Sequence, residues 1–224
     1  KYLVDIPSNV IEIHEAFLDT ALTQRVKKNT NVKLNPTQYQ AVSQLVRCEN
    51  PDIKVLLDTF ESNMVNPVEL FMGEAFLNIV KEYCREKFQF VGFTNLFWTV
   101  RSMFLPLLYL VGQPMPEVDI YHSCSTGYAG VLGAFAARKY DKPYIVTEHG
   151  IYTRQREEEI LRSDWVATHF KEYWIAMFYM FSRFAYQEAQ QITCLFQRAA
   201  IIQEDIGCPP EKISVIGNGI KVDE

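Results

Sequence analysis

The sequence predicts an α/β protein in which a Rossmann-like parallel sheet is flanked by helices and preceded by a helix-rich first half. Three observations predict this class. Short apolar runs alternate with helical patterns from about residue 118 onward, as in βαβ units. Before that point nearly every periodic segment has helical spacing. With 224 residues, 48% of them hydrophobic, the chain is long enough to bury a substantial core.

The first half is predicted to contain one short strand and four helices. These elements are expected over residues 10–13, 35–47, 52–60, 73–88 and 94–110. The helix over 35–47 has the clearest start, because Asn35 caps free backbone N–H groups and Pro36 suits the first helical turn. The helix over 73–88 is amphipathic, which predicts that one side is buried. The residues that share this side are Phe76, Ile79, Val80, Tyr83 and Cys84.

From residue 118 the pattern changes to strands separated by helices. Strands are expected over 118–121, 144–147, 192–195 and 213–216. Helices are expected over 126–140, 153–162, 166–189 and 197–206. Since crossovers between parallel strands are right-handed, the carboxyl ends of these strands are expected on one side of the sheet. In open α/β sheets ligands bind beyond those carboxyl ends, so this edge is where a functional site is expected.

Two of the predicted strands end in polar residues, and each end carries a histidine. The strand over 144–147 is followed by Glu148, His149 and Gly150. The strand over 118–121 is followed by a polar loop. Its residues are His122, Ser123, Cys124, Ser125, Thr126 and Gly127. We expect both histidines to face one shared crevice.

His149 is the stronger candidate for a functional residue. A neutral imidazole donates a hydrogen bond to a sugar hydroxyl or a phosphate, and Gly150 lets the backbone approach a ligand closely. Glu148 can set the tautomer of His149 or pair with an arginine. The alternative, a core histidine that is hydrogen-bonded and inert, stays open.

The polar loop has two interpretations. Ser123, Ser125 and Thr126 can cap the helix that follows, or the free N–H groups of its first turn can bind an anion or a sugar hydroxyl. Glycines recur at every third position of this helix, which favours close packing over a phosphate-binding loop. They are Gly127, Gly130 and Gly133. A thiol catalyst built from His122 and Cys124 lacks the sequence context of known nucleophile motifs.

Arg154 and Arg156 lie at the start of the helix over 153–162. Arg154 with Glu158, and Glu158 with Arg162, have i,i+4 spacing, so a solvated charged face explains them. The functional alternative is that one arginine turns toward the crevice and meets a phosphate or a carboxylate.

Composition and residue counts argue against several classes of function. Net charge is −5 with no long basic run, which argues against a nucleic-acid-binding surface. Five cysteines without a C-x-x-C pair predict neither a disulfide framework nor a zinc site, and four histidines without ligand spacing predict no metal. The scattered cysteines fit a reducing cytoplasm, which is the compartment we expect.

Residues 96–111 are mostly apolar and aromatic, but Arg101 and Pro106 lie within them. A spanning helix needs ~20 apolar residues with few or no charges, so a core or interfacial helix is predicted instead. The aromatic stretch over 173–186 has apolar side chains all around its helix and is predicted to lie between layers.

Several motifs together resemble a known enzyme family. Residues 121–127 (YHSCSTG) and 143–154 (PYIVTEHGIYTR) resemble the PelF-like glycosyltransferases of glycosyltransferase family 4. Residues 7–13 (PSNVIEI), 192–195 (ITCL) and 207–220 (GCPPEKISVIGNGI) add further matches, so the resemblance covers nearly the whole chain. The TEHGIYTR run is fairly specific, whereas the NGI ending is common across the family.

The resemblance implies the GT-B fold, in which two Rossmann-like domains bind a nucleotide sugar between them. Residues 1–216 would form the N-terminal, acceptor-side domain, and 217–224 would begin the linker to a donor-binding second domain. The family's first strand and glycine-rich loop would precede residue 1. Its second domain, with a basic pair and an E-x7-E motif, would follow residue 224. We therefore expect the chain to be inactive alone.

The resemblance also implies roles for particular residues. His149 matches the T-x-H histidine of the family, which contacts the donor hexose near its C6 hydroxyl, so His149 is the expected catalytic residue. The expected substrate-binding residues are His122, Ser123, Ser125, Thr126, Gly127, Glu148, Gly150 and Arg154. The family usually needs no metal and no carboxylate nucleophile, so the UDP-sugar donor is expected to act without a cofactor.

The function that follows is transfer of a hexose from a UDP-sugar to a growing exopolysaccharide or related glycan, with retention of configuration. The alternative is a non-catalytic glycosyltransferase-like scaffold in a membrane-bound polysaccharide synthase, docked through the exposed aromatic helix over 94–111. Expected partners are a nucleotide sugar, a glycan acceptor and inner-membrane synthase subunits, with no nucleic acid. The expected location is the cytoplasm, including its membrane surface.

Overall fold

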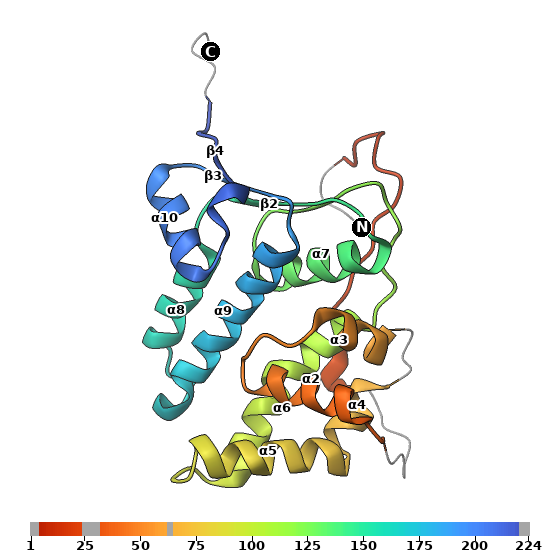
Figure 1. Cartoon of the computed structure of the whole chain (residues 1–224), viewed down its shortest axis with the longest axis vertical. Coiled ribbons are helices and arrows are strands. Elements are labelled where there is room, and N and C mark those ends of the chain that lie inside the picture. Colours follow the sequence, from red (N-terminus) through yellow and green to blue (C-terminus); the bar gives the residue numbers. More distant parts are fainter. Residues whose placement is uncertain (1–4, 24–31, 62–64, 220–224) are drawn as a thin grey trace.

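The computed structural model describes residues 5–23, 32–61 and 65–219 and shows a helical first half beside a four-stranded parallel sheet (Figure 1). The helices of the first half are α1 (Thr20–Thr23), α2 (Pro36–Val46), α3 (Ile53–Phe60), α4 (Pro67–Phe71), α5 (Glu74–Lys87) and α6 (Phe93–Val111). The four helices predicted there are confirmed as α2, α3, α5 and α6. The short helices α1 and α4 lie outside the predicted segments.

The first-half helices begin where capping side chains are available. The Asn35 side chain accepts from the Gln38 N–H at 2.9 Å, and the Gln38 side chain accepts from the Asn35 N–H at 3.0 Å, forming a capping box. The Asp52 carboxylate accepts from the N–H groups of Lys54 and Val55 at the start of α3. These local contacts explain why the helix starts are readable in the sequence.

The second half alternates strands and helices as expected. Its strands are β1 (Tyr121–Ser123), β2 (Tyr144–Glu148), β3 (Gln191–Cys194) and β4 (Ile213–Val215). Its helices are α7 (Gly127–Tyr140), α8 (Tyr152–Arg162), α9 (Lys171–Glu188), which follows a short 3-10 turn, and α10 (Gln197–Ile206). All strand pairs are parallel and the order in the sheet is β1-β2-β3-β4, which confirms the predicted α/β fold class.

The connecting helices cover one face of the sheet. Each strand after β1 pairs with the strand that precedes it in the chain, so right-handed crossovers place every connecting helix on the same face of the sheet. Burial agrees, because alternate residues along β1, β2 and β3 are buried while those between them are not. Figure 1 shows α7, α9 and α10 on the same side of the strands. The other face carries partly exposed residues, among them His122, Ile145, Thr147, Gln191 and Thr193.

The two halves share one core. Helix α6 is buried along most of its length, as the sequence predicts for an apolar helix containing Arg101 and Pro106. Tyr173 of α9 lies between the halves, and its hydroxyl donates to the Val46 carbonyl at the end of α2. Aromatic rings meet there, with the Tyr83 and Tyr173 centroids 5.5 Å apart. Within the described residues, no helix is long and apolar enough to cross a membrane.

Two strand predictions are wrong in detail. Residues 10–13 form no strand, and Ile11 is 100% exposed, because the apolar run has no neighbouring strand to pair with among the described residues. The first strand of the sheet begins at Tyr121 rather than at Val118, since pairing with β2 starts where the Tyr121 N–H donates to the Pro143 carbonyl at 2.8 Å. His122 and Ser123 therefore lie within β1 and not beyond its end.

The three glycines of α7 allow close packing, as predicted. A Cβ on Gly133 would lie 2.5 Å from the Tyr144 ring of β2, and a Cβ on Gly127 would lie 2.5 Å from the Tyr152 ring of α8. A Cβ on Gly130 would lie 3.2 Å from the Cβ of Ala185 in α9. The glycine positions thus set the distance of α7 from the sheet and from its neighbouring helices.

Gly133→Ala is expected to destabilise the protein. Alanine favours a helix interior by about 1 kcal/mol over glycine, but the fully buried Tyr144 ring cannot move freely. We expect a net loss of about 1–3 kcal/mol in the free energy of unfolding, typical of overpacking, measured by urea denaturation. Gly217→Ala, whose Cβ would meet only the Leu195 carbonyl at 3.8 Å, is the control. Equal stability of the two variants would contradict the packing role of Gly133.

Candidate functional site

The uncovered face of the sheet carries a row of hydrogen-bonded polar side chains. Nε2 of His122 on β1 lies 2.8 Å from Oγ1 of Thr147 on β2. The Thr193 hydroxyl on β3 donates to the same Thr147 oxygen at 2.9 Å. Parallel pairing of the three strands brings these residues together, because Thr147 lies opposite Thr193 in the register. The row crosses three strands and leaves the His122 ring exposed.

The roles of His122 Nε2 and Thr147 Oγ1 in this row depend on the histidine tautomer. In one tautomer the Thr147 hydroxyl accepts a hydrogen bond from Thr193 and donates its own proton to His122 Nε2. A neutral ring then carries its proton on Nδ1. Nδ1–H remains a donor on an exposed ring, which suits a hydrogen bond to a hydroxyl or an anionic oxygen.

Glu148, the last residue of β2, faces the helices and is 1% exposed. The Tyr186 hydroxyl of α9 and the Gln203 amide of α10 donate to Oε2 at 2.6 and 2.9 Å. The Thr126 hydroxyl donates to Oε1 at 3.3 Å, and the backbone N–H of Tyr152 also donates to the carboxylate. One buried carboxylate therefore ties the end of β2 to the segments that begin α7 and α8 and to α9 and α10.

This network changes two predicted roles. Within the described residues, the Glu148 carboxylate has no arginine partner, and its hydrogen bonds run to uncharged groups. Thr126 is the N-cap residue of α7, but its hydroxyl is used by Glu148 and makes no cap hydrogen bond. Ser123 is buried as well, with its hydroxyl 2.7 Å from the Tyr144 hydroxyl. Capping by Ser123 or Thr126 is thus not found, because both hydroxyls face the buried side of the sheet.

His149 and Gly150 follow directly after β2. The His149 side chain is exposed, which excludes the alternative of an inert core histidine. A Cβ on Gly150 would lie 2.9 Å from the Gln155 side-chain nitrogen, so α8 closes over this turn. His122 lies in β1 and contacts Thr147 of β2, which is two residues before His149.

A hollow of about 470 Å³ lies beside β1, lined by the start of the polar loop. His122, Ser123 and Cys124 form one wall, and Leu132 and Gly133 of α7 belong to another. His149 is not among the residues that line this hollow. The hollow therefore follows the outer edge of β1 and is not the single crevice predicted between the two histidines.

The start of α8 is a solvated charged face. Arg154 pairs with Glu157 at 3.3 Å, and Arg162 pairs with Glu158 at 2.9 Å. Arg156 pairs with Glu159 and lies over the Tyr152 ring. The predicted pair of Glu158 with Arg162 is confirmed, whereas Arg154 uses i,i+3 rather than i,i+4 spacing. Arg154 remains exposed in this arrangement and bound to a neighbour of its own helix.

Comparison with known protein families gives one match. The model of a domain of unknown function, DUF3492, covers residues 1–211. The chain belongs to the DUF3492 family. Neither the curated proteins nor the solved structures contain a match to it. The family match spans the helical half and the parallel sheet together, so both belong to this DUF3492 domain.

Sequence reasoning missed several residues that build this part of the DUF3492 domain. Thr193, Tyr186 and Gln203 lie far along the chain from β2, and no local motif marks them. The alternation along β3 places Thr193 on the open face and would have suggested it once the register with β2 was known. Among the described residues, no group of three or more His, Cys, Asp or Glu side chains could hold a metal ion.

The pKa of Glu148 gives a test of the buried network. Burial raises this pKa and is the largest influence, whereas the four donors lower it, and the net direction is upward. A carboxyl group whose pKa is higher in the folded than in the unfolded state stabilises the fold at pH values below its ordinary pKa of 4.5. That contribution is lost as the pH rises through the folded-state pKa.

Glu148→Gln removes this titration, so the pH dependence of the two proteins should differ. As the pH rises above the ordinary pKa of 4.5, the stability of the unchanged protein relative to Glu148→Gln should fall. Urea denaturation at a series of pH values measures this difference. Glu204→Gln, an exposed change on α10, controls for loss of charge. If the stability of the unchanged protein relative to Glu148→Gln rises with pH instead, the four donors outweigh burial and the pKa of Glu148 is lowered.

Proposed function

We propose that this DUF3492 domain is the acceptor-side, N-terminal Rossmann-like domain of a GT-B glycosyltransferase. The full enzyme would move a hexose from a UDP-sugar to a growing exopolysaccharide or related glycan with retention of configuration. The observation that carries the proposal is the exposed His149 directly after the carboxyl end of β2, where parallel α/β sheets bind ligands, with the exposed His122 on the neighbouring strand β1. The resemblance of residues 121–127 and 143–154 to PelF-like glycosyltransferases supports the same function.

In this proposal His149 is the catalytic residue and donates a hydrogen bond to the donor hexose. A preorganised donor of this kind lowers the barrier if the bond strengthens as charge develops in the transition state. His122 contributes its Nδ1–H to an acceptor hydroxyl. Glu148 is a positioning residue, because its buried hydrogen bonds fix the end of β2 from which His149 extends. A carboxylate so buried is not available as a nucleophile, which fits attack on the same face as departure.

The remaining partners follow from this assignment. The donor phosphates would be bound mainly by a second domain, and no metal is required of the residues in this chain. The acceptor would be a glycan, and synthase subunits at the inner membrane are proposed as protein partners. The proposed location is the cytoplasm, including its membrane surface.

The test uses a protein that contains both proposed domains. Release of UDP from UDP-glucose and from UDP-N-acetylglucosamine is measured for the unchanged protein and for His149→Ala. Loss of a transition-state hydrogen bond should lower kcat by about 100-fold. His14→Ala changes an exposed histidine that pairs with Glu12 and should leave kcat unchanged. An active enzyme in which His149→Ala and His14→Ala behave alike would overturn the role of His149.

A second candidate function is a non-catalytic scaffold in a membrane-bound synthase. The observation in its favour is Trp98 of α6, a large apolar side chain that is 53% exposed. The two functions differ in a simple readout. Absence of UDP release from the two-domain protein, together with vesicle binding that is lost in Trp98→Ser, would favour the scaffold.

A further inference from the structure

All three tryptophans of the chain line one hollow. The hollow has a volume of about 330 Å³ and lies between α6 and the segment that leads into α9. Trp98 belongs to α6, Trp165 to the segment after α8, and Trp174 to α9. Trp98 is 53% exposed and Trp165 is 69% exposed, whereas Trp174 is half-buried. We call this hollow, with its three indoles, the tryptophan pocket.

The side of α6 that faces the tryptophan pocket has an unusual composition. Asn95, Trp98, Thr99 and Ser102 have i, i+3, i+4 and i+7 spacing and therefore share one face. An exposed helix face in a soluble protein ordinarily carries charged residues. This one carries an indole, an amide and two hydroxyls. Among the residues that the structure describes, the Asn95 side chain has no hydrogen-bond partner, so its donors and acceptor face solvent.

The indoles are held in place by other aromatic rings. The Trp165 and Trp174 rings meet edge to face, with centroids 5.4 Å apart and an interplanar angle of 82°. Trp98 meets Phe97 in the same way, with centroids 5.4 Å apart and an angle of 85°. Edge-to-face contact is a favoured geometry for aromatic rings, so these pairs stabilise the orientation in which the indoles are exposed to a ligand.

Charge near the tryptophan pocket disfavours an anionic membrane as its partner. Asp164 precedes Trp165, and Glu172 lies two residues before Trp174, while the whole chain has a net charge of −5. The ammonium group of Lys171 is held by the carbonyls of Leu161 and Ser163 at 2.7 and 2.9 Å. Binding to anionic lipid relies on clustered free lysine and arginine. Among the described residues no lysine or arginine lines the tryptophan pocket itself, and the nearby Arg101 guanidinium lies over the Trp98 ring, 5.6 Å from its centroid.

We propose that the tryptophan pocket binds a neutral glycan chain. Pyranose rings present C–H faces that pack on indole, and their hydroxyls are donors and acceptors for amide and hydroxyl side chains. The tryptophan pocket supplies both kinds of group, and no aspartate, glutamate, lysine or arginine is among the described residues that line it. Under the proposed function, on which this part of the inference rests, the bound glycan is the acceptor.

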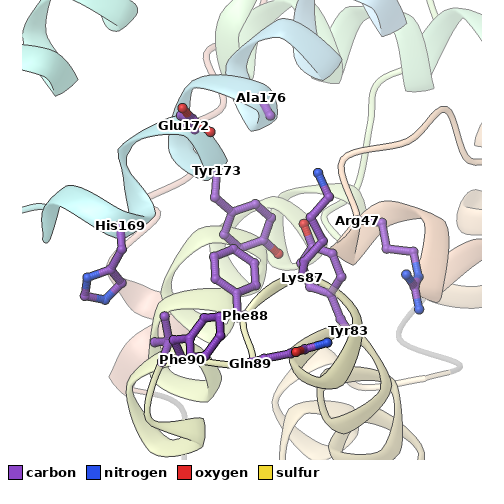
Figure 2. A pocket seen from close by; sticks show the side chains of 11 residues that line it. Arg47, Tyr83, Lys87, Phe88, Gln89, Phe90, His169, Glu172, Tyr173 and Ala176 are labelled. Atoms are coloured by element: carbon purple, nitrogen blue, oxygen red, sulfur yellow. The ribbon is translucent and has the colours of Figure 1, made fainter.

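A second hollow extends the tryptophan pocket. His169 lines both, and the second hollow has a volume of about 500 Å³. Figure 2 shows His169 on one side of this hollow and Phe90 and Gln89 below it, with Lys87 beyond. Phe90 is fully exposed, so its ring is free to stack on a further sugar unit. Two adjoining hollows suit an oligosaccharide better than a single hexose.

Glycan binding at the tryptophan pocket would be separate from the sheet edge. Trp174 lies near the start of α9, whereas Tyr186, which bonds Glu148, lies near its end. At 1.5 Å per residue these positions are roughly 18 Å apart along the helix. The tryptophan pocket would therefore hold the glycan chain at a distance from its reacting end.

The test measures binding of maltohexaose, cellohexaose and chitohexaose, and of the matching disaccharides, to the protein without any UDP-sugar. Because all three tryptophans line the pocket, intrinsic tryptophan emission reports binding there, and calorimetry gives the affinity. We expect a saturable emission change with at least one hexasaccharide. Trp98→Ala and Trp165→Ala should each weaken its binding about tenfold. Phe17→Ala, an exposed ring elsewhere, should have no effect.

The length of the oligosaccharide provides a sharper test. Phe90→Ala should weaken binding of the hexasaccharide several-fold and leave binding of the disaccharide unchanged, because only the hexasaccharide reaches the second hollow. Circular dichroism checks that each variant is folded, which is expected for side chains this exposed.

Two results would overturn the proposal. One is the absence of a saturable response to all three hexasaccharides. The other is sedimentation with phosphatidylcholine or phosphatidylglycerol vesicles that depends on Trp98 and Trp165, without oligosaccharide binding. Failure of the transferase assay would leave glycan binding intact, so the two proposals fail separately.

Discussion

The buried carboxylate of Glu148 is the interaction on which the C-terminal half depends. It ends β2 on the helix side of the sheet and receives donors from α9 and α10, from the N-cap of α7 and from the first residue of α8. Taking a carboxylate out of water costs several kcal/mol unless its oxygens are fully hydrogen-bonded. The four donors offset part of that cost, and each of them would lose this partner without the carboxylate. The turn that carries His149 thus begins at the hydrogen-bonded end of β2.

Helix α9 connects this point to the helical half. Its C-terminal end supplies Tyr186 to the carboxylate, and Tyr173 near its start bonds the end of α2. The packing of α9 on α7, in which Gly130 approaches Ala185, fixes its position between these ends. The sheet and the helical half are therefore joined by one continuous element, which explains why they form a single core.

The sequence predicted what depends on local signals. Asn35 with Pro36 marks a helix start through contacts within three residues, and the structure has this cap. The helix predicted from residue 52 is also present, and the Asp52 side chain caps it. The glycine spacing in α7 predicted close packing, because a residue without a Cβ lets a neighbouring element approach its backbone closely. Residues 10–13 were misjudged, since an apolar run forms a strand only when a partner strand is present, and no local pattern reveals that partner.

The candidate site was only partly predictable for the same reason. His122, Glu148 and His149 were found from their position at strand ends. The direction in which each side chain points depends on the register of β1 and β2, and a shift of β1 by three residues moved His122 into the strand. The partners Thr193, Tyr186 and Gln203 come from distant segments. Only the folded arrangement identifies them.

The order of strands in the sheet bears on how the protein is made. Each described strand after β1 pairs with the one that directly precedes it in the chain, so its partner has already left the ribosome when it emerges. Paired strands that follow one another in the chain are separated only by the segment that connects them, whereas a sheet whose middle strand comes last needs contacts between more distant segments. Contacts between segments closer in sequence form faster. Synthesis from the N-terminus can thus extend the sheet one unit at a time. The hydrogen bond from Gln203 of α10 to Glu148 joins β2 to a segment that is made more than fifty residues later.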